Sequence, residues 1–95
     1  MKDITKEKID KYLAVTTKAI SLVKIAPEKK IQWKPSAEDF LDMASRYLAD
    51  AKHYYEKGDY VTAFAAVNYA HGWLDAGARI GLFDVDNSGN LFTVD

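Results

Sequence analysis

The chain has 95 residues, which is enough for one small domain with a modest core and too few for a catalytic domain joined to a regulatory one. Its composition, 48% hydrophobic and 28% charged with five glycines and two prolines, excludes a disordered or low-complexity chain. The absence of cysteine excludes disulfides, thiolate zinc sites and cysteine nucleophiles, so stability must come from packing.

The net charge of −1 conceals an uneven distribution. Residues 1–35 contain nine lysines and four acidic residues, a net charge of +5, whereas residues 36–95 contain four basic and ten acidic residues, a net charge of −6. The basic segment could contact an anionic partner, but we favour a solvated helix face partly balanced by the acidic half. The charged N-terminus does not resemble a secretory signal, and the longest apolar run, residues 63–67, is too short to cross a bilayer. We therefore expect a soluble, cytoplasmic protein without a membrane partner.

The first predicted helix covers residues 5–25. Asp3 or Thr5 can cap its N-terminus, and Pro27 marks its end because a proline ring clashes with a continuing helix. The connector that follows, residues 27–35, contains Trp33, which either closes one end of the core or contacts a partner. We favour the first role, because burial of an aromatic side chain is worth a few kcal/mol. The apolar residues of the helix recur every three or four positions: Ile9, Tyr12, Leu13, Thr16, Ala19, Ile20 and Val23.

Two further helices are predicted over residues 36–57 and 59–82, joined at Gly58. Ser36 is the expected N-cap of the first, and Asp59 that of the second. Gly58 can adopt the left-handed conformation that ends a helix, so the two helices should form an αα-hairpin. Small residues should let the two backbones approach closely: Ala44 and Ala51 on one helix, and Ala63, Ala66 and Ala70 on the other.

Residues 83–95 should form a short extended or hairpin-like tail around the polar turn at residues 86–90, held to the bundle by Leu91, Phe92 and Val94. The sequence thus predicts a single all-α domain over residues 1–95, an antiparallel three-helix bundle with this C-terminal tail. A second copy of the turn at Gly58 is missing from the sequence, which argues against a helical repeat array.

Residues 55–83, YEKGDYVTAFAAVNYAHGWLDAGARIGLF, together with the closing LFTV segment, resemble an archaeal family of short proteins catalogued as domain of unknown function 357. The resemblance covers residues 36–95 well and the first helix loosely. It implies an archaeal, cytoplasmic helical bundle, and it brings no established activity or catalytic residues.

A polar row on the third helix is the first candidate site. Asn68, His71, Asp75 and Arg79 are spaced three, four and four residues apart, so they project from one face. His71 and Asp75 could hold a metal or form an acid–base pair, and Arg79 could bind a phosphate or carboxylate. The structural alternative, which we favour, is that Asp75 pairs with Arg79 while His71 completes the core and bonds to Asp75 or Asn68.

Arg46 and His53 form an alternative RNA site. Their spacing resembles the motif of the HEPN class of helical nucleases, in which arginine and histidine act on an RNA phosphate. Seven residues along a helix span about 10 Å on a shared face. The spacing is common by chance, and here it lies in mid-helix rather than at a helix opening.

Residues 84–95 fit the twelve-residue calcium loop weakly. Asp84, Asp86, Ser88 and Asp95 would supply oxygen ligands, and Gly89 would occupy the sharp turn. An EF-hand requires a bidentate glutamate opening an exit helix at the last position, and an ordinary turn explains the sequence better.

These patterns contain no nucleophile–base set, phosphate loop or strong metal cluster. We expect a non-enzymatic protein-interaction module without a cofactor or metal, which binds an unidentified protein or self-associates. The alternative is an RNA- or nucleotide-binding helical domain of the HEPN-like type.

Overall fold

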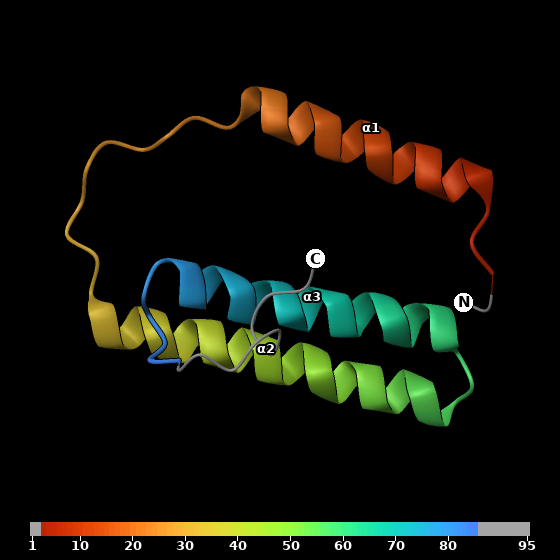
Figure 1. Ribbon diagram of the computed structural model, residues 1–95. Helices are drawn as coiled ribbons and strands as arrows, with labels where there is room; N and C mark the ends of the chain where they lie inside the picture. Colours follow the sequence, from red (N-terminus) through yellow and green to blue (C-terminus); the bar gives the residue numbers. More distant parts are fainter. Residues whose placement is uncertain (1–2, 86–95) are drawn as a thin grey trace.

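The computed structural model describes residues 3–85 and has three α-helices, α1 (Lys6–Leu22), α2 (Trp33–Glu56) and α3 (Tyr60–Arg79). The described part of the chain contains no strand, so the all-α prediction is confirmed. α3 folds back alongside α2, whereas α1 lies apart from both, beyond a long connector (Figure 1). Among the three helices of residues 3–85, close packing is confined to the pair formed by α2 and α3.

The seam between α2 and α3 is built from small side chains, as the sequence predicts. Ala44 and Ala51 are the buried residues of α2, and Ala63, Ala70 and Gly77 are those of α3. These five positions recur every seven residues along their helices, so they keep facing the partner helix over several turns. A seam without large side chains lets the backbones approach closely, and the larger residues then lie along its two flanks.

One flank of the hairpin carries two edge-to-face aromatic pairs. The rings of Phe40 and Trp73 have centroids 4.9 Å apart, and those of Tyr47 and Tyr69 have centroids 4.3 Å apart. In each pair one ring comes from α2 and the other from α3. Such pairs contribute about 0.5–1.5 kcal/mol beyond the area they bury, so they fix the register of the two helices.

Glycine ends both helices of the hairpin in the same way. Gly58 and Gly81 each have a φ of +77°, the left-handed region that disfavours side chains with a Cβ. The amide after each glycine donates to a carbonyl five residues back, with N–O distances of 3.0 Å for Asp59 to Tyr54 and 2.8 Å for Leu82 to Gly77. Both ends are therefore Schellman motifs, and the predicted stop at Gly58 is confirmed.

The start of α3 is predicted correctly and the start of α2 is not. The carboxylate of Asp59 accepts a hydrogen bond from the Thr62 amide at 3.2 Å, so Asp59 is the N-cap of α3. The expected Ser36 cap is wrong, because α2 begins at Trp33 and the Ser36 amide donates to the Gln32 carbonyl at 3.1 Å. Pro35 is the third residue of α2, in the first turn, where the backbone N–H that proline lacks would have no carbonyl partner within the helix.

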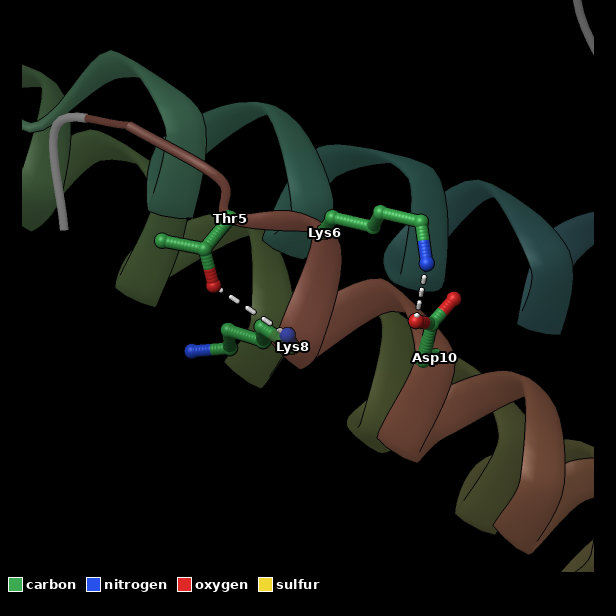
Figure 2. A network of polar contacts seen from close by, with 4 residues as sticks. All are labelled: Thr5, Lys6, Lys8 and Asp10. Carbon is green, nitrogen blue, oxygen red and sulfur yellow. Dashed lines mark hydrogen bonds and ion pairs between the residues drawn. The ribbon is translucent and has the colours of Figure 1, made fainter.

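α1 is stabilised by interactions between residues that are close in the sequence. The Thr5 hydroxyl caps it by accepting from the Lys8 amide at 3.1 Å, and the Lys6 ammonium pairs with the Asp10 carboxylate at 2.8 Å (Figure 2). The helix ends at Leu22, three residues earlier than expected, where Val23 turns to an extended conformation. No residue of α1 is buried, and Leu13 and Ile20 on its apolar face are 61% and 70% exposed.

The start of α2 lies close to the segment that follows α3, near Gly81. Trp33 is 57% exposed instead of closing the core, and its ring lies beside Gly81. Phe83 turns back onto α3, where its ring occupies the space that a Cβ at Gly77 would need. α3 ends at Arg79 rather than at residue 82, and Leu82 beyond it is buried. The predicted anchors of the tail, Leu91, Phe92 and Val94, lie outside the described residues.

Candidate interaction surface

The hairpin carries an apolar groove beside the turn that joins α2 to α3, which we call the turn-end groove. Its volume is about 690 Å³, and alanines of the seam, Ala51 and Ala63, form its floor. Its apolar walls come from both helices, and the residues that form them are Leu48, Tyr55, Tyr60, Phe64 and Val67.

The aromatic side chains of this groove are exposed, although the helices that carry them are packed together. Tyr55, Tyr60 and Phe64 are 66%, 62% and 68% exposed. The rings of Tyr55 and Tyr60 contact each other across the turn with centroids 5.5 Å apart, which joins the two walls at one end. The hairpin therefore presents several large apolar side chains at its surface.

Two charged residues of α2 complete the rim of the turn-end groove. Lys52 and Glu56 line it one helical turn apart. Within the described part of the chain neither of them forms an ion pair, and they do not pair with each other. The order of the two residues explains this in part, because a lysine four residues before a glutamate is the less favourable orientation on a helix.

A second apolar groove, of about 590 Å³, lies between α1 and α3. Ile9, Tyr12 and Leu13 of α1 line it together with Val61 and Ala65 of α3. At about 100° per residue, the direction of Val61 and Ala65 lies about 110° around α3 from that of Phe64 and Val67. α1 therefore lies by a neighbouring face of α3, and the turn-end groove stays exposed.

The predicted polar row on α3 is only partly connected. Asp75 and Arg79 form an ion pair with an Nε–Oδ1 distance of 3.0 Å, as the structural alternative expects. Asn68 is exposed, and no hydrogen bond joins it to His71 in residues 3–85. The Nε2 atom of His71 is buried without a hydrogen-bond partner there, so the expected bond to Asp75 or Asn68 is not formed at this atom. The Nε1 atom of Trp73 is in the same situation.

Arg46 and His53, the alternative RNA site, both lie on the exposed side of α2. The Arg46 guanidinium pairs with the Asp42 carboxylate at 2.9 Å, and the His53 ring lies against Tyr54 with centroids 5.3 Å apart. An RNA phosphate that uses Arg46 must therefore compete with a carboxylate of the same helix.

The candidate calcium loop falls almost entirely outside the described residues, which include Asp84 but not Asp86, Ser88 or Asp95. Within residues 3–85 no group of three or more histidine and acidic residues is placed to hold a metal ion. No helix in this part of the chain is both long enough and apolar enough to cross a membrane.

The sequence patterns do not distinguish the residues of the turn-end groove from a core, because apolar residues at helical spacing are typical of a buried face. Tyr60, Phe64 and Val67 form one helical row of α3, next to the row of buried alanines. The sequence does contain one signal of exposure. α3 has apolar residues on more than one face, and a single neighbouring helix cannot cover all of them. Their exposure depends on where α1 lies, which local patterns do not determine.

These features define a small all-α protein built around a packed helical hairpin with an exposed aromatic groove. The chain belongs to the family described as protein of unknown function, DUF357, whose model matches residues 11–83. The match includes most of α1 and ends at Phe83, so the LFTV segment lies outside it. No curated protein and no solved structure matches the chain.

Proposed function

We propose that this protein is a non-enzymatic protein-interaction module that binds its partner through the turn-end groove. The observation that carries the proposal is the exposure of Tyr55, Tyr60 and Phe64 on two tightly packed helices. Contiguous apolar patches on a soluble chain mark interaction sites, and aromatic anchors dominate the binding energy of protein interfaces. We take the module to act in the cytoplasm of an archaeon, as the family resemblance implies.

The geometry of the groove supports a protein as the ligand. Its walls are aromatic and aliphatic, and the charges near it, Lys52 and Glu56, have opposite signs and lie at the rim. An apolar centre with a polar rim is the usual anatomy of a protein interface, whereas a nucleic-acid surface would require a basic patch between the aromatic residues. Because the backbone on both sides is helical, little conformational entropy is lost when the groove is filled.

Site-specific photocrosslinking in cells tests the proposal. A photoreactive phenylalanine analogue replaces Phe64 in one variant and Ala49, on the exposed side of α2, in the control. We expect discrete protein adducts from position 64 only, and their loss when Tyr60→Glu places a charge in the same groove. Equal adduct yields from the two positions would contradict the proposal.

The RNA-binding alternative stays a prediction. It requires that Arg46 contribute to phosphate binding in spite of its ion pair with Asp42. Fluorescence anisotropy with single-stranded RNA measures this directly. A loss of affinity of tenfold or more in Arg46→Ala, together with retained affinity in Lys52→Ala, would favour this alternative over the interaction module.

A further inference from the structure

The charged residues at the rim of the turn-end groove are arranged so that they can pair with those of a second copy of the chain. The rim contains one lysine and one glutamate, Lys52 and Glu56, on the same side of α2 and one turn apart. When a two-fold axis passes between a positive and a negative side chain, rotation by 180° places each of them opposite the other kind in the second copy. The same operation places the aromatic walls of one groove against those of the other.

We propose that the occupant of the turn-end groove is the turn-end groove of a second copy of this chain, which gives a two-fold symmetric dimer. The inference rests on the proposed function and names its partner. In the dimer, Lys52 of each copy faces Glu56 of the other, and Phe64 of each copy packs beside the Tyr55–Tyr60 contact of the other. The two-fold axis repeats each of these two contacts once.

The charges support this occupant. Lys52 and Glu56 have no ion-pair partner in the described part of the chain, so both are available across an interface. Their order along α2 disfavours pairing within the helix, whereas a two-fold axis supplies a partner for each. The net charge of −1 produces almost no long-range repulsion between two copies.

The exposure of the groove itself also supports it. Leu48 and Val67 on its walls are 44% and 43% exposed, and its three aromatic rings are exposed by more than 60%. A second copy would remove this apolar surface from water, which favours association. α1 lies by a different face of α3, about 110° around the helix from the face that lines the turn-end groove.

The experiment is sedimentation velocity of the full chain between 1 and 200 μM, roughly the range over which modest dimers dissociate. Four chains are compared: the wild type, Lys52→Glu, Glu56→Lys, and the control Asp50→Lys, which changes a charge of α2 outside the groove. Far-UV circular dichroism verifies that each chain is folded. The 1:1 mixture of Lys52→Glu with Glu56→Lys is measured as a fifth sample.

We expect the wild type and the control to dimerise with the same Kd. Each single reversal places two like charges opposite each other twice, and should weaken the dimer about tenfold or more. The mixture should recover the wild-type Kd, because a heterodimer of the two variants pairs every glutamate at the rim with a lysine. A purely structural effect of the substitutions would not be reversed by mixing.

A wild type that stays monomeric at 200 μM overturns the inference. So does a mixture that stays as weak as its components, and so does a dimer that neither reversal affects, which would point to another surface such as an exchanged α1. If the chain is monomeric and photocrosslinks from position 64 reach a different protein, the self-association fails while the proposed function stands. If position 64 also gives no specific adduct, both fail.

Discussion

The α2–α3 hairpin and α1 are both amphipathic helical segments, yet they are held by different kinds of interaction. The hairpin buries a seam of small residues, carries two interhelical aromatic pairs and ends both helices in Schellman motifs. α1 has a hydroxyl cap and a surface ion pair, and buries no residue. Amphipathic periodicity therefore predicts that a helix forms, but it does not predict how much of its apolar face is covered.

The reason lies in the contacts available to each segment. α2 and α3 are joined by a three-residue turn, which places their alanine rows opposite each other at little entropic cost. α1 is joined to α2 by residues 23–32, a connector without helix or strand, and none of its apolar residues is buried. The stability of the molecule should thus depend on the hairpin, and three changes test this in order of decreasing effect.

The largest effect is expected from a charge in the seam. Ala51 is 3% exposed, so Ala51→Asp buries a carboxylate without a partner and should lower the free energy of unfolding by about 3–5 kcal/mol. Leu13→Asp, on the apolar face of α1, should change it by less than about 1 kcal/mol because Leu13 is 61% exposed. Urea denaturation followed by circular dichroism measures both.

The distinction between the hairpin and α1 would be wrong if Leu13→Asp lowered the free energy of unfolding as much as Ala51→Asp. That outcome would mean that α1 is part of the core in solution. Ala49→Asp, on the exposed side of α2, is the matched control for the charge itself and should have little effect.

An intermediate effect is expected at the glycines of α3. A Cβ at Gly77 would overlap the ring of Phe83, so Gly77→Ala must displace that ring and should cost about 1–3 kcal/mol. A Cβ at Gly72 meets nothing within 4 Å, so Gly72→Ala should stabilise the helix by about 0.5–1 kcal/mol. Thermal unfolding should show melting temperatures that shift in opposite directions.

The smallest global effect is expected at the cap of α1. Thr5→Ala removes the hydrogen bond to the Lys8 amide and should weaken α1 locally by about 1 kcal/mol. Amide hydrogen exchange should become faster in Lys6–Leu22 while the rates in α2 and α3 stay the same. Thr17→Ala, the same change in mid-helix, is the control and should not accelerate exchange.

The turn at Gly58 and Asp59 and the alanine seam could be predicted because their causes are local. A left-handed glycine, a capping carboxylate and a seven-residue spacing of small side chains act within one or two turns of helix. Ser36 shows the limit of this reasoning. Its cap pattern is strong, but the helix begins three residues earlier because Pro35 is tolerated in a first turn.

The turn-end groove could not be predicted as a surface because exposure is a long-range property. The sequence identifies the row of Tyr60, Phe64 and Val67, and any helix lying against it would have made it core. α1 instead lies by Val61 and Ala65. Similarly, the ion pair of Asp75 with Arg79 follows from i,i+4 spacing, whereas the unpartnered Nε2 atom of His71 does not.

The connector between α1 and α2 also determines which competitors can displace α1 from the side of α3 that it faces. Its ten residues reach at most about 33–36 Å, which keeps α1 tethered close to the hairpin. A short flexible tether corresponds to an effective concentration on the order of 1 mM. A free helix at micromolar concentration must therefore bind that side far more tightly than α1 does in order to replace it, whereas no other helix of residues 3–85 is tethered over the turn-end groove.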